Sequence, residues 1–305
     1  MLGSREYGQI SKDLDEAIRT HSLPASESIY PNLIDHYSLR ARIEFSAGRN
    51  REALDDLDTV MKMDLDSADR VSNIEGVEAE KTSKPCVWNL TDLDTLVTKF
   101  PRDYQPALLL GIYFKFFTTF KEDYYPKALQ EFQKATLLNP KSPLPQYFIG
   151  QLYSKASFWT KAAWASDEGR NGPYRRAIAA YTKAIQLDPN FRLAYAERAS
   201  AYHGLKQYPQ AIKDYDRVLD LDPENVTAYN DRGLARMEIG QYPSANLDFG
   251  DAIRRKDEQA TTLGMSYQNR GDAYVWAERK QFWRKEQQRC TGRNFREYIS
   301  AGLRG

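Results

Sequence analysis

The sequence contains two consecutive segments of 34 residues that follow one pattern. Residues 192–225 read RLAYAERASAYHGLKQYPQAIKDYDRVLDLDPEN, and residues 226–259 read VTAYNDRGLARMEIGQYPSANLDFGDAIRRKDEQ. The pairs that share the interval of 34 are Pro189 with Pro223, Tyr195 with Tyr229, Pro209 with Pro243, and Tyr215 with Phe249. Four features with a single period indicate a structural repeat.

Each repeat predicts a pair of helices. In the first segment, apolar residues recur every three or four positions over 193–205 and again over 209–221. Pro209 suits the first turn of the second helix, where its missing N–H would have no partner, and Pro223 stops that helix. Small residues at Ala199 and Ala211 predict a close crossing of the two helices, while Tyr215 predicts packing between neighbouring repeats.

The pattern resembles the tetratricopeptide repeat (TPR) family. The residues that carry the resemblance are Tyr195, Ala199, Tyr202, Ala211, Tyr215, Val218 and Pro223 in one repeat, and Tyr229, Gly233, Ala245, Phe249 and Ala252 in the next. Arg236 and Asp257 depart from it, and Asp257 predicts an irregular turn after the second repeat. The resemblance implies an all-α fold, a right-handed superhelical solenoid of antiparallel helix pairs whose first helices line a concave groove.

The resemblance extends outward from these repeats and divides the chain into five segments. They are a helical cap at 1–33, degenerate TPR-like repeats at 34–103, two TPR-like repeats with insertions at 104–189, two regular repeats at 190–259, and a partial repeat with a C-terminal capping helix and basic tail at 260–305. Within 34–103, a unit begins near Ile34, and a helix is predicted over 91–99. The neighbouring Asp55 and Asp56 are predicted to lie on a solvated helix face.

Positions two, five, six, nine, twelve and thirteen of each repeat should face the groove, as the resemblance implies. The predicted partner-binding residues at these positions are Tyr147, Gln151, Glu197, Ser200, His203, Asn230, Asp231, Leu234, Gln268, Asn269 and Asp272. Asn and Gln suit a peptide backbone because each carries a donor and an acceptor. The recurring carboxylates favour a partner with Lys or Arg. Alternatively, Glu197, Asp231 and Asp272 pair with the nearby Arg198, Arg232 and Arg270.

An insertion near residues 158–173 carries Trp159 and Trp164. Tryptophan is enriched where proteins bind one another, so these residues form a possible aromatic anchor for a partner. Alternatively, they belong to a longer first helix and pack on the next repeat.

No catalytic motif stands out. The sequence lacks phosphate-binding glycine loops, a nucleophile elbow and a zinc-protease motif, and none of its three histidines has a second metal ligand at helical spacing. The only cysteines, Cys86 and Cys290, suggest neither a disulfide framework nor a zinc site. We therefore predict a protein without a cofactor that is no enzyme but an interaction scaffold.

Composition leaves two further hypotheses open. The net charge of +1 hides a basic C-terminal stretch with Arg279, Lys280, Arg284, Lys285 and Arg289, which makes nucleic-acid binding a less favoured alternative. An assembly or regulatory subunit that oligomerises through its outer faces and ends is the other alternative. No signal sequence and no apolar run of 18 residues occurs, so the sequence as given predicts a cytoplasmic protein without a membrane span.

Overall fold

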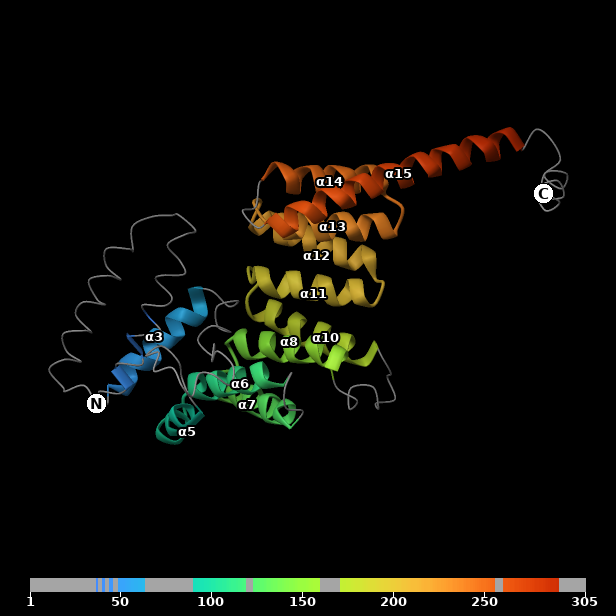
Figure 1. The fold of residues 1–305 in the computed structure, drawn as a ribbon. Coiled ribbons are helices and arrows are strands. Elements are labelled where there is room, and N and C mark those ends of the chain that lie inside the picture. The colour runs from blue at the N-terminus through green and yellow to red at the C-terminus, as the bar shows by residue number, and fades with distance from the viewer. Residues whose placement is uncertain are drawn as a thin grey trace. The chain divides into compact units, whose positions relative to one another are not determined.

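The computed structural model describes residues 37, 40–41, 44–45, 49–63, 90–118, 123–159, 171–255 and 260–290 (Figure 1). Throughout these ranges the regular elements are helices. They are α3 (Asn50–Met63), α5 (Leu90–Lys99), α6 (Tyr104–Phe117), α7 (Tyr124–Leu138), α8 (Leu144–Trp159), α10 (Gly172–Leu187), α11 (Arg192–Gly204), α12 (Tyr208–Leu221), α13 (Val226–Glu238), α14 (Tyr242–Arg254) and α15 (Ala260–Cys290). The all-α prediction is thereby confirmed.

The chain divides into two compact units, residues 1–189 and 190–305. In the first unit, α6 packs on α7 and α8 packs on α10, while α5 and α3 contact α6. The predicted helix over 91–99 is confirmed as α5, and the two predicted helix pairs of 104–189 are present.

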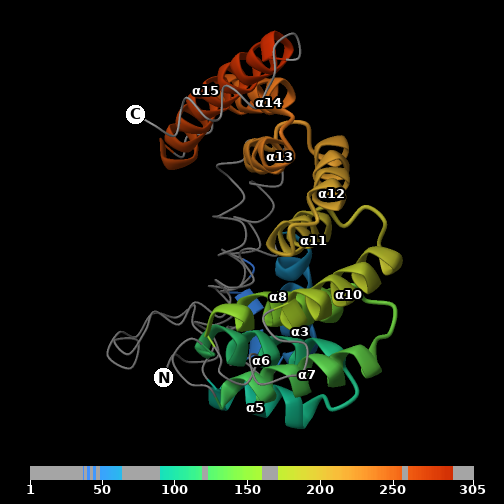
Figure 2. The ribbon, with the colours of Figure 1, turned by 90° about the vertical axis from the view of Figure 1, so that its right-hand side faces the viewer.

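The second unit contains the two regular repeats. The α11–α12 and α13–α14 pairs pack internally, α12 contacts α13, and α14 contacts α15, so successive helices lie side by side (Figures 1 and 2). The predicted boundaries at 193–205 and 209–221 agree with α11 and α12 to within one residue. Both α12 and α14 carry proline in their first turn, as the missing N–H requires.

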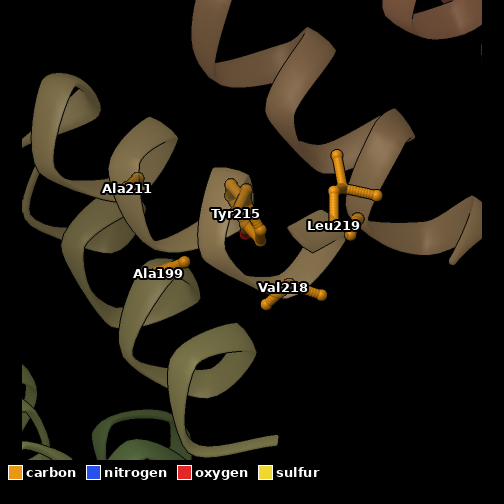
Figure 3. Packing of buried hydrophobic residues seen from close by; sticks show 6 residues of the cluster. Ala199, Ala211, Tyr215, Val218 and Leu219 are labelled. Atoms are coloured by element: carbon orange, nitrogen blue, oxygen red, sulfur yellow. The ribbon is translucent and has the colours of Figure 1, made fainter. Parts of the chain in front are cut away.

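A small residue on each first helix faces a large one on the second. In the α11–α12 pair, Ala199 and Ala211 are fully buried beside Tyr215 (Figure 3). Elsewhere the small residue is glycine, and an added Cβ would come within 2.6 Å of a ring: Gly111 against Phe132, Gly150 against Tyr181, and Gly233 against Phe249. The aromatic side chains thus fill notches left by the small residues, which lets the paired helices approach closely.

A charge pair also recurs at three places in the chain, always with the aspartate 16 positions after the arginine. Its members are Arg40 with Asp56, Arg198 with Asp214, and Arg232 with Asp248, at N–O distances of 2.5, 2.7 and 2.7 Å. The first pair corrects the prediction of a solvated Asp56, whose residue is only 6% exposed. Asp56 is buried because its carboxylate is matched by the Arg40 guanidinium.

The C-terminal helix differs from its prediction in one respect. We predicted the first helix of a partial repeat and then a separate capping helix, but both lie on one uninterrupted helix, α15, which projects beyond α14 (Figure 1). In the part of the chain that the structure describes, no helix is both long enough and apolar enough to cross a membrane. The predicted N-terminal cap and the turn after Asp257 fall outside the described residues.

Candidate functional site

Four of the predicted groove residues meet at one small pocket in the second unit. Ser200 and His203 from α11 and Asp231 and Leu234 from α13 line it, and Tyr215 from α12 completes the wall. The volume is about 120 Å³, enough for one side-chain end group but not for a cofactor. The 34-residue period produces this convergence, because it places positions nine and twelve of one first helix beside positions six and nine of the next.

Asp231 gives the pocket its negative character. Burial raises the pKa of its carboxyl to about 6, and a hydrogen bond from Asn230 opposes this only in part. Among the described residues Asp231 forms no ion pair, since the adjacent Arg232 binds Asp248 and Asp216 instead. The predicted alternative, in which Asp231 pairs with Arg232, is therefore wrong.

Two further groups make the pocket polar. Burial lowers the pKa of His203, so its ring is neutral at pH 7, and its Nε2 is buried without a hydrogen-bond partner in the described structure. Burial, and then the negative charges of Asp231, Glu197 and Asp214, raises the pKa of the Tyr215 hydroxyl. The site thus offers an incoming group a carboxyl, a neutral imidazole and the hydroxyl of Ser200.

The predicted charge pairs are arranged differently from expectation. Arg198 donates two hydrogen bonds to Asp214, each of 2.7 Å, and Glu197 is half-buried on the same helix. Arg270 stacks over Tyr267 with 5.4 Å to the ring centre, and no ion pair joins it to Asp272 in the described structure. Arg198 therefore joins α11 to α12, whereas Arg270 stacks on a tyrosine of its own helix.

In the first unit, the predicted groove residues are interior ones. Tyr147 is fully buried, and Gln151 is only 8% exposed. The amide of Gln151 accepts a hydrogen bond from the buried Lys115 ammonium at 2.7 Å and donates one to the Tyr147 hydroxyl at 2.9 Å. Neither side chain presents a surface to a partner, because both complete a buried polar network that the repeat pattern alone does not predict.

The remaining predicted residues lie at the α13–α15 contact or on its rim. Asn230 is 6% exposed, and its Oδ1 accepts hydrogen bonds from Ser266 at 3.3 Å and from Asn269 at 3.1 Å. Gln268 and Asp272 are exposed on α15. Asn230 and Asn269 thus join two helices, which leaves Gln268 and Asp272 as the accessible members of this group.

The predicted aromatic anchor falls largely outside the described part of the chain. Trp159 ends α8, but its side chain is not among those described, and Trp164 lies in the undescribed segment. Sequence reasoning missed Tyr215 as a pocket residue and treated it only as packing. Tyr215 lies on α12, between α11 and α13, and both of these helices carry predicted groove residues. This position was the signal that could have identified Tyr215 as a pocket residue. Among the described residues, no three metal-binding side chains gather.

Comparison with known proteins agrees with the repeat pattern. A family model described as the TPR repeat matches residues 201–240. No curated protein matches the chain. Similar solved structures include a thermophilic TPR protein of Thermus thermophilus (12% identity, TM-score 0.47, covering 77% of this chain and 98% of that one) and the protein MamA (21% identity, TM-score 0.44, covering 56% and 88%). Likeness at this level identifies no ligand for this chain.

The family match covers the end of α11 and all of α12 and α13, which include four of the five pocket residues. The same small-residue notch and the same arginine–aspartate spacing recur in other helix pairs of the chain. The chain therefore contains tetratricopeptide repeat sequence, which the family model matches over residues 201–240.

Proposed function

We propose that the protein is a non-enzymatic scaffold that binds a peptide or protein segment on the face formed by α11 and α13, with a Lys or Arg side chain of the partner in the Asp231 pocket. The observation that carries the proposal is the convergence of Ser200, His203, Asp231 and Leu234 from two repeats on one pocket. A site built from side chains of successive repeats recognises an extended ligand, since such a ligand runs across several repeats.

Charge supports a cationic side chain as the occupant. The Asp231 carboxyl lies among the negative charges that raise the pKa of Tyr215, and no cation of the described structure neutralises it. A Lys or Arg end group would provide the missing charge partner, while Ser200 supplies a hydrogen bond at the rim. The apolar wall at Leu234 suits the methylene stem of such a side chain.

The pocket lacks the arrangement that an enzyme would need. His203 and Ser200 lie on one helix three residues apart, with no hydrogen bond between them, and their neighbour Asp231 is paired with Asn230 rather than with the imidazole. A nucleophile has to reach a base that a third group orients, and these residues do not form such a chain. The proposal is therefore binding rather than catalysis.

Binding of a cationic side chain should depend on pH through Asp231. The carboxyl of the free protein has a pKa of about 6 and must be ionised to pair with the cation. When the pH is below this pKa, the Asp231 carboxyl must lose its proton before the cation can bind. Affinity should therefore fall as the pH drops below about 6 and be constant above about 7. The Asp231→Asn variant should bind weakly with no such dependence.

The experiment is affinity capture from an extract of the native cell, with retained proteins identified by mass spectrometry. Wild type, Asp231→Asn and Asp220→Asn are compared, because the Asp220 carboxylate lies on α12 with 69% of its side chain exposed, outside the pocket. A protein retained by wild type and Asp220→Asn but lost from Asp231→Asn supports the proposal. Equal retention by all three variants would show that binding lies elsewhere.

A further inference from the structure

The first half of α15 lies in the position of a repeat's first helix. In α11 and α13 the third and tenth positions are buried alanines: Ala194, Ala201, Ala228 and Ala235. In α15 the same two positions are Ser266 and Ala273, both 0% exposed, and α15 contacts α13 and α14. The remaining repeat features follow in register, with Tyr267 at position four, Arg270 at position seven and Gly271 at position eight.

Among the described residues, none covers the surface of α15 that a second helix covers in the other repeats. An added Cβ on Gly271 would meet no atom of the described residues within 4 Å, whereas its counterpart on Gly233 would lie 2.6 Å from the Phe249 ring. Tyr267 is 52% exposed and Tyr274 is 57% exposed on the same helix face. We call the surface formed by Tyr267, Arg270, Gly271 and Tyr274 the α15 socket.

Arg270 shows which charge would complete the socket. In three repeats the arginine at position seven stacks on the tyrosine three residues earlier and pairs with an aspartate of the second helix. Arg270 makes the same stacking contact with Tyr267, but in the described structure it has no carboxylate partner. The missing helix should therefore carry an aspartate directly before an apolar residue, as Asp214 precedes Tyr215 and Asp248 precedes Phe249.

Residues 7–18 have the sequence of such a helix. They read YGQISKDLDEAI, against YPQAIKDYDRVL for residues 208–219 in α12. The identical residues are Tyr7, Gln9, Lys12, Asp13 and Asp15. Asp13 stands at the charge-pair position and Leu14 at the notch-filling position, where α3 also carries a leucine, Leu57. Ile10 replaces the alanine at 211, and Gly271 leaves more room for it than Ala199 would.

We propose that residues 7–18 of a second copy of this chain bind as a helix in the α15 socket, with Asp13 paired to Arg270 and Leu14 over Gly271. Repeats contact only their neighbours, and several helix pairs separate residues 7–18 from α15 along the same chain. The contact joins two different surfaces, so it is heterologous and builds head-to-tail chains or rings. It involves neither Asp231 nor the pocket proposed for a partner segment.

Residues 291–305 are the competing occupant, because Glu297 and Tyr298 partly fit the same pattern. Residues 291–305 follow α15 directly in the sequence, and this link is too short for them to reach the socket of the same chain. Gly271 lies 19 residues before the end of α15 at Cys290, which is about 28 Å along a helix axis. An extended link to Asn294 followed by one helical turn brings Tyr298 only about 20 Å back.

The test measures binding of a fluorescent peptide of residues 5–20 to the full-length chain by anisotropy. The wild type should bind it, and Arg270→Glu should weaken binding by at least about tenfold, since a charge-assisted pair is lost. The peptide with Asp13→Lys should recover binding to the Arg270→Glu chain. Two controls carry matched charge changes: Arg279→Glu on the exposed side of α15, and Glu16→Lys in the peptide, where α12 has Arg217. Neither control should change the affinity more than about twofold.

The Gly271→Ala variant tests peptide binding without an expected loss of folding stability. The new methyl group meets no described residue of the free chain, so thermal unfolding should be unharmed, yet it would occupy the notch and weaken peptide binding. Sedimentation velocity should show wild type gaining mass with concentration, and Gly271→Ala and Arg270→Glu remaining monomeric. A monomeric wild type, tighter binding of a 291–305 peptide, or an affinity indifferent to Arg270→Glu would each overturn the proposal. Asp231→Asn should assemble like wild type, so this result is independent of the pocket.

Discussion

At the scale of single residues, side-chain size at one repeat position decides how closely two helices pack. Gly233 lies under the Phe249 ring, whereas Gly271 at the same position of α15 has no described residue opposite it. The same substitution should therefore have opposite effects at these two sites, which makes them a matched pair.

Gly233→Ala should destabilise the protein by about 1–3 kcal/mol, because the new methyl group overlaps a buried ring. Gly271→Ala should instead stabilise the chain by up to about 1 kcal/mol through the higher helix propensity of alanine. Urea unfolding followed by circular dichroism measures both. Equal effects at the two positions would contradict the proposed notch.

Asp231 makes the stability of the second unit dependent on pH. Its pKa of about 6 exceeds the ordinary value of 3.8, so between these values the folded chain binds a proton that the unfolded chain releases. Stability should therefore rise as pH falls through this window. Asp231→Asn should be more stable than wild type at pH 7.5 by on the order of 1 kcal/mol, allowing for partial exposure of the site, and similar to it at pH 4. Thermal unfolding at both pH values measures the difference, and a constant difference would refute the assignment.

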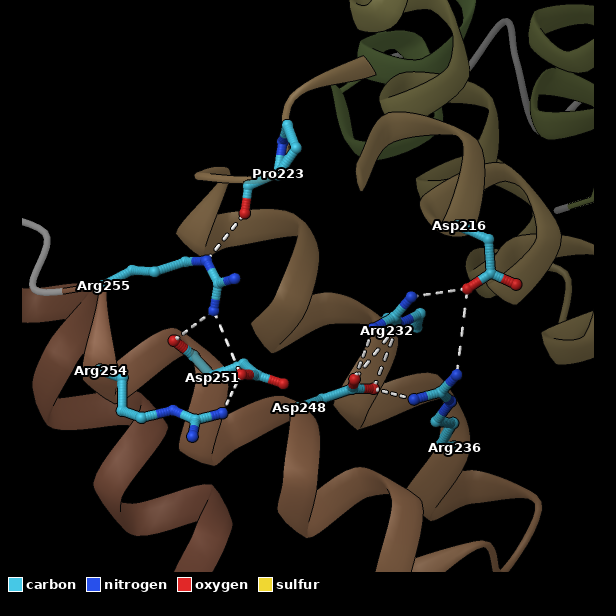
Figure 4. A network of polar contacts seen from close by, with 8 residues as sticks. All are labelled: Asp216, Pro223, Arg232, Arg236, Asp248, Asp251, Arg254 and Arg255. Atoms are coloured by element: carbon cyan, nitrogen blue, oxygen red, sulfur yellow. Dashed lines mark hydrogen bonds and ion pairs between the residues drawn. The ribbon is translucent and has the colours of Figure 1, made fainter. Parts of the chain in front are cut away.

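At the scale of helices, one arginine joins three consecutive elements of the second unit. Arg232 on α13 binds Asp248 on α14 and Asp216 on α12, each at 2.7 Å, and Arg236 on α13 contacts the same two carboxylates (Figure 4). Arg255 extends the contacts by donating to the Pro223 carbonyl at 2.7 Å. The Arg232–Asp216 pair joins one repeat to the next. Within its repeat, the Asp248 residue is only 2% exposed, so its carboxylate depends on its arginine partners.

Arg232→Ala should cost about 3 kcal/mol, since a buried carboxylate loses its principal partner. Arg254→Ala is the control because Arg254 forms only an exposed pair with Asp251 on its own helix, and it should change stability by less than about 0.5 kcal/mol. Chemical denaturation of the two variants gives the comparison. Similar losses in both would show that the network adds little.

The helices themselves could be predicted from the sequence, but some of their contacts could not. The 34-residue period predicted α11 to α14 because proline and small residues mark the ends and crossings of each helix in a local pattern. Burial of Tyr147 and Gln151 escaped prediction, because it depends on Lys115, a buried residue 36 positions before Gln151. The sequence also did not predict that α15 is one continuous helix. No proline or glycine near Trp276 indicates where a helix would end, and no local pattern indicates that the helix continues.

At the scale of the whole molecule, two surfaces have different proposed roles. The Asp231 pocket lies between repeats and is proposed to hold a partner segment, whereas the α15 socket lies after the last regular repeat and is proposed to join copies of the chain. A repeat array permits this separation because each helix pair depends chiefly on its neighbours. A change at one surface should therefore leave the other intact.

Contact between another protein and the α11–α13 face at the pocket is the central claim. A photo-cross-linking amino acid placed at Ser200 in the native cell tests it most directly, with the same group at Leu137 as a control that is 82% exposed on α7. We predict one discrete cross-linked partner from position 200, absent from position 137 and reduced by Asp231→Asn. No adduct at position 200, or the same adducts from both positions, would contradict a binding site at this pocket.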